Sequence, residues 1–509
     1  MRTGLEQVDG ALAAPGQAKG GDAQPPGLAT AFGTYFAARL LAAVLGLAAV
    51  SVFSRLVTPE VYGIYTLVIA ASYSLVEILF QWLRSGVIRF LPGATDGGTK
   101  VVSAALIGCG LLMVLIIVLA GLLVVTKVLP VPTHLVLLGT GILLAKGAFE
   151  LRLAVLQSHQ RPQDYAILST GRAAGGLVIG SALALAGGGA EGILIGWLIA
   201  NCLPLGSIIT ARGHRARMTA EVGDTLKTMA VFGLPMALVS LGGALIANGD
   251  RYVIAYLIGV DAAGAYAVPY DLAQRSLFML VAISFLASSP AVFRAYERGE
   301  PEVGQAKLLA QMRLILLIGF PAATLLGAAA PLVSRIVLGE GFREAANELL
   351  PWISAAVLIH GINSFYASYG LTITRRTMWN AVIVFAGAGF NLALNFMLIP
   401  EMGALGAAIA TLVSYGAVLA ASLTVSRRWI KLPWPTMDMI KTVLICCLCA
   451  PFLAMAARHG SLPLAIFLVT IGAGALYALM VVFDAAGARS AARKMVTKSG
   501  LEPARIGLK

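Results

Sequence analysis

The sequence predicts an all-α, polytopic membrane protein with fourteen transmembrane helices. The chain has 509 residues, of which 59% are hydrophobic and only 12% are charged. A typical soluble domain carries about twice that fraction of charge. Apolar runs of about 18 or more residues recur from residue 29 to residue 483, and about 20 helical residues cross a bilayer core of roughly 30 Å. A helical bundle in a membrane therefore accounts for both observations.

Breaks rich in proline or glycine separate the apolar runs and set the order of the spans. Prolines stand at positions 59, 130, 132, 400 and 433, and three glycines occupy 187–189. Proline lacks the amide donor that a helix interior needs, and glycine permits tight turns. The expected spans are residues 31–56, 62–83, 101–127, 134–157, 164–187, 190–211, 228–250, 262–293, 308–332, 350–373, 377–399, 403–425, 438–457 and 461–483.

Three polar segments flank or divide these spans. Residues 1–28 have no apolar core and no cleavage pattern, so we expect a disordered cytoplasmic tail and no signal peptide. Residues 212–227 form a basic cytoplasmic linker, and residues 484–509 form a basic cytoplasmic tail. The expected domains are these three segments, a first lobe at 29–211, a second lobe at 228–425, and two further helices within 426–483.

The distribution of lysine and arginine predicts the orientation. With the N-terminus inside, 26 of the 37 basic residues lie in or beside inside segments. Cytoplasmic loops of membrane proteins carry such an excess, and it places both termini in the cytoplasm. Anionic lipid facing these loops explains the net charge of +13 without a nucleic-acid partner. The six basic residues expected outside are Arg55, Lys127, Arg251, Arg335, Arg343 and Arg458.

The cysteines give no reason to expect a disulfide framework, a metal site or a cofactor. All five lie inside apolar runs, where cysteine behaves as a small apolar residue, and their spacing matches no zinc pattern. They are Cys109, Cys202, Cys446, Cys447 and Cys449.

An internal repeat divides the first twelve spans into two sets of six. The stretch "GAEGILIGWLIAN" (189–201) aligns with "GALGAAIATLVSY" (403–415), and "LVTPEVYGIY" (56–65) aligns with "LIGVDAAGAY" (257–266). Matches in order at similar offsets indicate duplication. Because six is even, both copies enter the membrane from the same side, and a pseudo-two-fold axis along the membrane normal should relate the two lobes.

Polar residues inside the second lobe have two interpretations. Asn391 and Asn395 are four residues apart on one helix face, and small residues from Gly403 to Ser414 follow them. Such residues allow helices to pack closely in lipid and to form hydrogen bonds between helices. With Asn248 and Asp250 they are candidates for a structural or a gating role.

Three stretches resemble the polysaccharide-transporter branch of the multidrug/oligosaccharidyl-lipid/polysaccharide (MOP) exporter superfamily. They are "SRLVTPEVYGIYTLV" (54–68), "NGDRYVIAYLIGVDAAGAY" (248–266) and "LNFMLIPEMGALGAAIATLVSY" (394–415). The resemblance covers about residues 30–485. It implies two six-helix lobes around a central cavity, and a flippase or exporter of lipid-linked sugars in the bacterial inner membrane. It also implies a groove for a lipid tail at the last two helices, and partners among membrane lipids and other polysaccharide-assembly proteins.

Charged residues inside the spans are the candidates for substrate binding in this cavity. They are costly in a bilayer and usually face a cavity or a partner. Lys146 with Glu150, and Asp271 with Arg275, have the i,i+4 spacing of neutralising pairs. The candidate binding residues are Arg39, Arg275, Lys146, Arg172, Asp271 and Glu77, of which Arg39 and Arg172 have no acidic partner, and Glu77 no basic one, nearby in sequence.

The arginines favour an anionic substrate. Arg39 shares a helix face with small residues including Gly46, so we expect that face to line the cavity. Arg275 lies near the middle of span 8. Guanidinium groups bind phosphate oxygens through paired hydrogen bonds, and a polyprenyl-pyrophosphate-linked oligosaccharide offers such a group. We therefore expect a flippase for this class of substrate, and no catalytic activity.

Other interpretations stay open at this point. A cation-coupled multidrug exporter of the same fold would use unpaired carboxylates and aromatic faces. An enzyme acting on lipid-linked sugars normally needs a large outside loop, and the longest, at 333–349, shows no catalytic constellation. His360 occupies the position that matches Lys146 in the repeat, and could be a proton-coupling group or a hydrogen-bonded interior histidine.

Overall fold

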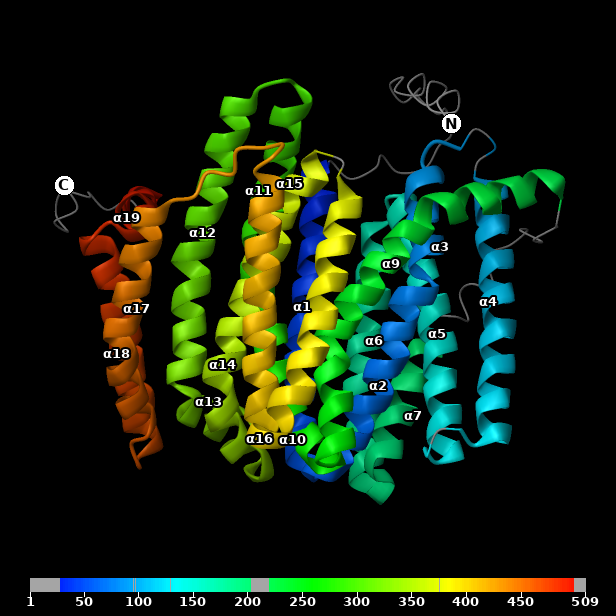
Figure 1. Ribbon diagram of the computed structural model, residues 1–509, viewed down its shortest axis with the longest axis horizontal. Coiled ribbons are helices and arrows are strands. Elements are labelled where there is room, and N and C mark those ends of the chain that lie inside the picture. The colour runs from blue at the N-terminus through cyan, green and yellow to red at the C-terminus, as the bar shows by residue number, and fades with distance from the viewer. Residues whose placement is uncertain are drawn as a thin grey trace.

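The computed structural model describes residues 28–94, 96, 98–128, 130–202, 219–374 and 376–498, and all regular structure among them is helical. Long helices stand side by side between an upper and a lower edge (Figure 1). Residues 1–27 of the expected N-terminal tail, residues 203–211 of the expected sixth span, residues 212–218 of the linker and the last eleven residues of the C-terminal tail lie outside the described residues.

The first half of the chain contains the helices expected for spans 1 to 6. Thr58 caps α2 by accepting a hydrogen bond from Val61 N, and Pro59 occupies its first turn, where no amide donor is needed. Span 2 continues beyond its expected end, because α3 extends it to Phe90. The bounds are α1 Leu28–Leu56, α2 Pro59–Leu79, α3 Gln81–Phe90, α4 Thr99–Thr126, α5 Thr133–Ser158, α6 Pro162–Leu183, η2 Ala184–Gly188 and α7 Gly189–Cys202.

The second half begins within the expected linker, since Ala220 already starts a helix, and a helix also forms in the expected C-terminal tail. The bounds are α9 Ala220–Leu257, α10 Val260–Ala273, η4 Gln274–Phe278, α11 Met279–Glu297, α12 Pro301–Ala328, α13 Ala330–Val337, η5 Glu340–Phe342, α14 Arg343–Ile362, η6 Asn363–Ala367, α15 Ser368–Ile373, α16 Thr377–Ser426, α17 Thr436–Ala457, α18 Leu462–Val482, η7 Ala485–Gly487 and α19 Ala488–Lys498.

The helices identify a multi-pass membrane protein. Among the described residues, 11 helices are long and apolar enough to cross a bilayer, or 12 if the bent pair Ala220–Leu234 and Met236–Leu257 forms one span. Their outward faces carry large apolar side chains: on α4, Leu111, Val114 and Val118 are each about 60% exposed. Exposed apolar faces of this extent are stable against acyl chains.

Two of these long segments reverse direction at glycines. Gly189 has φ 51° and ψ −135° where α7 begins, and Gly403 has φ 61° and ψ −142° inside α16. Glycine adopts this backbone conformation without the steric cost that a side chain would add. Figure 1 shows α16 as two antiparallel rods joined at the lower edge. The two glycines that the repeat aligns therefore share one unusual conformation.

A second pair of aligned glycines brings α2 and α10 together. A Cβ atom at Gly63 would overlap the carbonyl oxygen of Val260, and one at Gly264 would overlap that of Pro59. Val260 lies four residues before Gly264, and Pro59 lies four residues before Gly63. Each glycine therefore contacts the equivalent position of the other copy, and the contact is reciprocal. Reciprocal contacts are what a two-fold relation between two similar units produces.

Further contacts between the two halves close the lower edge. Ser51 Oγ, on α1, donates to the carbonyl of Val337 at 2.6 Å, and the amide of Gly339 donates to Ser54 Oγ at 3.2 Å. The end of α1 thus contacts the end of α13 and the segment that follows it.

Replacing Gly264 with alanine is expected to destabilise this closed edge. Alanine in a helix is normally more favourable than glycine by about 1 kcal/mol, but here the added methyl overlaps backbone atoms and overpacking costs about 1–3 kcal/mol. Gly243→Ala is the matched control, because no atom lies within 4 Å of its Cβ position. Thermal unfolding in detergent should show a lower Tm for Gly264→Ala and an unchanged or higher Tm for Gly243→Ala. Equal Tm values would contradict the contact.

Candidate functional site

A charge network crosses three helices of the first half. Arg84 Nη1, on α3, lies 3.4 Å from Glu77 Oε1 on α2 and 3.2 Å from Glu150 Oε2 on α5. Lys146 forms the expected salt bridge with Glu150 one helical turn away. The expectation that Glu77 lacks a basic neighbour was wrong. The bend between α2 and α3 keeps residues seven apart on one side of the span, so Arg84 reaches it.

Arg172 of α6 lies beside this network among aromatic rings. Its Nη1 donates to the hydroxyl of Tyr73 at 3.4 Å, and its guanidinium lies 5.2 Å from the ring centre of Phe149 and 5.7 Å from that of Trp197. Lys146 Nζ lies 5.2 Å from the centre of the Tyr73 ring. Tyr73 therefore links Arg172 to the network, and cation–π contacts hold both cations in place.

Arg275 lies in the five-residue π-helix η4 between α10 and α11. π-helical turns inside α-helices are rare and often occur at functional positions. The guanidinium packs directly on Gly46 of α1, where a side chain would overlap it. Its nearest charged and phenolic neighbours include Asp271 and Tyr65. Arg275 thus points from the second half toward the first.

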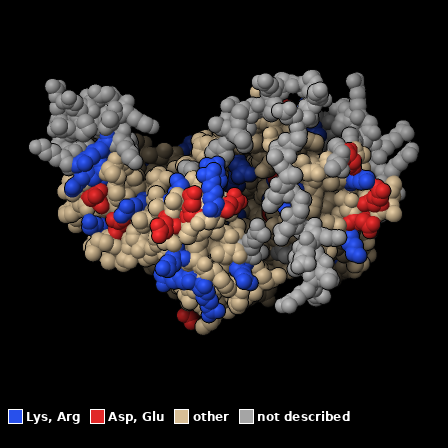
Figure 2. Space-filling view, turned by 90° about the horizontal axis from the view of Figure 1, so that it is seen from above, with Lys and Arg blue, Asp and Glu red and all other residues tan. Residues whose placement is uncertain are grey.

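Arg39 lies on the same face of α1 as Gly46, because residues seven apart are nearly aligned on a helix. Seven residues at 1.5 Å each place it about 10 Å nearer the upper edge than Gly46, and its side chain is exposed. Lys and Arg side chains gather on the upper face, and some lie recessed below the surrounding surface (Figure 2).

Asp271 forms no salt bridge with Arg275, contrary to the expected pairing, although it remains a charged neighbour of Arg275. Asp271 of α10 forms its salt bridge with Arg251 of α9, which also donates to Thr66 Oγ1 of α2 at 2.6 Å. The expected position of Arg251 in an outside loop was also wrong. The helix α9 continues to Leu257, and Arg251 is only 5% exposed within it. Because Asp271 pairs with Arg251, Arg275 forms no salt bridge among the described residues.

Asp250 is the centre of a separate, fully buried polar network. Its carboxylate accepts hydrogen bonds from Tyr266 Oη at 2.8 Å, from Asn395 Nδ2 at 2.6 Å and from Thr411 Oγ1. Asn395 Nδ2 also donates to Asn391 Oδ1 at 3.1 Å. The network joins α9, α10 and both arms of α16; Asn395 connects helices, and Asn391 contacts Asn395 within its own arm. Whether they also gate transport stays a prediction.

Neighbouring candidates lie at the edges of this network. Asn248 Nδ2 donates to Ser74 Oγ of α2 at 3.1 Å, which adds a contact between the two halves. His360 is stacked between Phe278 and Tyr415, with ring centres 5.0 Å and 4.5 Å away. Stacking on both faces favours an interior role for His360.

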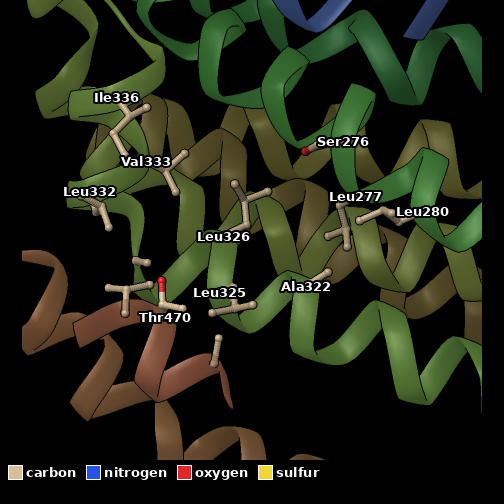
Figure 3. Close-up of a pocket in the computed structure, with 13 residues that line it drawn as sticks. Ser276, Leu277, Leu280, Ala322, Leu325, Leu326, Leu332, Val333, Ile336 and Thr470 are labelled. Carbon is tan, nitrogen blue, oxygen red and sulfur yellow. The ribbon is translucent and has the colours of Figure 1, made fainter. Parts of the chain in front are cut away.

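An apolar groove runs along the other side of η4. It has a volume of about 480 Å³ and is bounded by α12, α13 and α18. Figure 3 shows Leu325, Leu326 and Leu332 around it, with Thr470 on α18 and Ser276 on η4. We call the charged side chains around Arg275 and the adjoining network of Arg84, Lys146 and Arg172 the cationic site. Ser276 follows Arg275 directly in the chain, so one π-helix contributes to both the cationic site and the apolar groove.

Basic side chains outnumber acidic ones among the described charged residues of these networks. No group of three or more His, Cys, Asp or Glu among the described residues could hold a metal ion. The cationic site contains five basic groups and three acidic ones, so it carries surplus positive charge, and Arg39 lies farther up α1. The basic groups are Arg84, Lys146, Arg172, Arg251 and Arg275, and the acidic ones are Glu77, Glu150 and Asp271.

Sequence reasoning missed several residues of these networks. The predicted spans end at residues 83 and 250, so they leave Arg84 and Arg251 just outside the membrane, whereas α3 and α9 include both. Thr411 was grouped with the small packing residues, and only the fold shows that its hydroxyl reaches Asp250. Nothing in the sequence singles out Tyr73 from the other tyrosines.

The fold is similar to those of several solved transporters. A structure described as lipid II flippase MurJ in an inward closed conformation matches with a TM-score of 0.70 and 15% identity, covering 88% of this chain and 98% of that one. An inward-facing multidrug resistance MATE family transporter of the MOP superfamily matches at 0.54 and 15%, covering 78% and 94%. A MOP superfamily transporter from Pyrococcus furiosus matches at 0.53 and 13%, covering 78% and 95%.

Sequence comparison gives a family match. A family model described as polysaccharide biosynthesis protein matches residues 52–347. No curated protein matches the sequence significantly. The matched segment runs from the end of α1 to the beginning of α14, and so includes Arg84, Arg172 and Arg275.

Proposed function

We propose that this chain, which belongs to the polysaccharide biosynthesis protein family and shares its fold with transporters of the MOP superfamily, is a flippase for lipid-linked oligosaccharides. Its substrate is a polyprenyl-pyrophosphate carrying a sugar head group, which it carries across the bacterial inner membrane by alternating access. The proposal is one of transport, and it includes no catalytic step.

The position of Arg275 between a cationic site and an apolar groove carries this proposal. Such a substrate has three parts with different requirements: a charged diphosphate, a hydrated sugar and a long apolar tail. Arg275 packs on Gly46 beside the cationic side chains, while Ser276 and Leu277 of the same π-helix line the groove. Diphosphate and tail are bonded to each other in the substrate, so their binding sites must be neighbours.

The diphosphate is proposed to bind Arg39 and Arg275. Asp271 is held by Arg251, so it leaves the Arg275 guanidinium available for a substrate. Arg39 lies on the same face about 10 Å closer to the upper edge, where the substrate would enter. Lys146, Arg172 and Glu77 lie in the adjoining network, which would face the sugar and set the local charge.

A bulky side chain in the groove tests the tail site. Ala473 of α18 lines the groove, and Ala475, two residues later, is exposed on a different face of the same helix. Ala473→Trp is expected to slow flipping of a long-chain substrate at least tenfold in reconstituted vesicles, because the indole occupies the tail position. Ala475→Trp should flip at the wild-type rate. Wild-type flipping by Ala473→Trp would overturn the groove assignment.

We further propose fourteen crossings with the upper edge cytoplasmic. The reversals at Gly189 and Gly403 each divide one long segment into two spans. The reciprocal contact of Gly63 with Gly264 supports a two-fold relation between a first lobe, residues 29–211, and a second lobe, residues 228–425. The excess of basic residues in the predicted inside segments supports the orientation.

Reporter fusions test this topology. Fusions after Gly188 and Gly460 follow an odd number of predicted spans and are expected to give outside activity. Fusions after Gly213 and Gly500 follow an even number and are expected to give inside activity. Alkaline phosphatase, which is active only outside the cytoplasm, provides the measurement. Outside activity from the Gly500 fusion would refute the model.

A further inference from the structure

A second cavity lies in the first half, between the upper parts of α4 and α5. It has a volume of about 700 Å³. Its walls are largely apolar and include Leu106 and Met113 of α4 and Val155 of α5. Its upper end is different, because Arg152, His159 and Arg161 line it. The cavity therefore combines an apolar interior with a basic rim.

This cavity is separate from the cationic site. Glu150 points to Arg84 and Lys146. Arg152 is two residues further along α5, and two residues turn a helix by about 200°, so it faces the opposite side. Transport through the cationic site therefore does not account for the half-buried arginine at this position.

Arg152 has hydrogen-bonding capacity that the described residues do not use. Its Nε is buried without a hydrogen-bond partner. Its charged neighbours are Asp164 and Arg161, and Asp164 already lies 3.6 Å from Arg161 Nε. A buried guanidinium nitrogen without a partner costs free energy, so an anion at this position would stabilise it.

The depth of Arg152 indicates what kind of anion can reach it. The residue lies six positions before the end of α5 at Ser158, which is about 9 Å along the helix axis. α5 has 26 residues, so at 1.5 Å each it exceeds a hydrocarbon core of roughly 30 Å by about 9 Å, or about 4.5 Å at each end if the helix is centred. The backbone of Arg152 then lies about 5 Å below the level where phosphates meet acyl chains, a distance that an arginine side chain can span.

The outer surface of α4 continues the apolar cavity toward the membrane centre. Leu111, Val114 and Val118 follow the cavity residues along this helix and are each about 60% exposed. An acyl chain that leaves the cavity can continue along this surface. A soluble anion would gain nothing from these apolar walls.

We propose that the cavity between α4 and α5 binds an anionic phospholipid of the leaflet at the upper edge, with its phosphate on Arg152 and its acyl chains against α4. Arg161 and His159 would face the head group. The bound lipid fills the space between the two helices and stabilises the first half of the protein. The site is additional to the one proposed for transport.

Two pairs of variants test the charged and the apolar parts separately. Arg152→Gln removes the charge, and Arg298→Gln removes an exposed arginine elsewhere. Gly110→Phe fills the cavity, since Gly110 lines it and has no atom within 4 Å of its Cβ position. Gly121→Phe is its control, because Gly121 lies on the same helix face, three turns away, with equally open space.

The measurement is thermal unfolding of the delipidated full-length protein in detergent, with added lipid. Phosphatidylglycerol at about a hundredfold excess over its Kd is expected to raise Tm by roughly 2–3 °C in the wild type, Arg298→Gln and Gly121→Phe. It should raise Tm by less than half as much in Arg152→Gln and Gly110→Phe. Phosphatidylcholine and inorganic phosphate should have little effect.

Several results would overturn the proposal. These are an equal Tm rise with phosphatidylcholine, an equal rise with inorganic phosphate, or an undiminished response of both cavity variants to phosphatidylglycerol. If Arg152→Gln does not fold, the response of Gly110→Phe decides, because that variant keeps every charge. Native mass spectrometry of the same samples gives an independent count of retained anionic lipid, which should fall in Gly110→Phe and not in Gly121→Phe.

Discussion

Transport of the lipid-linked substrate is expected to fall at least a hundredfold when both Arg39 and Arg275 are replaced by alanine. Hydrogen bonds to charged groups contribute about 1.5–3 kcal/mol each, so losing two arginine–phosphate contacts removes about 3–6 kcal/mol of binding. Each 1.4 kcal/mol corresponds to a tenfold change. The exposed position of Arg39 and the packing of Arg275 on Gly46 allow both truncations without leaving a carboxylate unpaired.

The assay is flipping in vesicles, with insertion and Tm measured for each preparation. Arg428→Ala provides the control, because Arg428 is exposed in the loop after α16, away from the site. It should transport at the wild-type rate. Normal transport by a correctly inserted Arg39→Ala/Arg275→Ala protein would exclude these residues as the diphosphate site.

A membrane potential alone is expected to shift the transmembrane distribution of substrate by more than a thousandfold. A diphosphate diester carries roughly two negative charges, and each charge that crosses 100 mV changes the free energy by about 2.3 kcal/mol. Two charges therefore give about 4.6 kcal/mol. The cationic side chains belong to the protein and do not cross with the substrate, so they do not cancel this term.

Potassium-loaded vesicles with valinomycin can impose the potential at constant pH and sodium. Flipping should follow the potential in size and sign. Flipping that ignores the potential and follows only a proton or sodium gradient would show that titratable groups of the protein supply the energy. The buried Asp250 network and His360 would then be the residues to test.

Local patterns predicted some parts of this structure well. Lys146 and Glu150 are one helical turn apart, so their salt bridge depends only on the helix between them. The aligned glycines at 189 and 403 adopt matching backbone conformations because a tight reversal requires that conformation locally. In both cases, residues close in sequence determine the feature.

The contacts of Asp271, Arg251 and Asp250 depend on tertiary packing and were not predictable in this way. Asp271 had an i,i+4 partner available in Arg275, but the fold places Arg251 of another helix closer. Asp250 accepts hydrogen bonds from residues up to 161 positions away in the sequence. Spacing along the chain does not show which of several possible partners lies nearest, because that depends on how the helices pack. The sequence likewise does not show that Arg152 Nε is buried without a hydrogen-bond partner, because this depends on the packing around it.

The central claim is that the protein moves a lipid-linked oligosaccharide, and the most direct measurement is its translocation in vesicles that contain only the purified protein. A polyprenyl-pyrophosphate oligosaccharide, confined to the leaflet that faces the cytoplasmic side of the protein, is followed by its accessibility to a glycosidase on the other side. We expect protein-dependent access of the glycosidase to the substrate, accelerated by a potential that is positive on the receiving side. No translocation of this substrate, together with export of a lipophilic cation such as ethidium by the same vesicles, would contradict it and assign the chain to multidrug export.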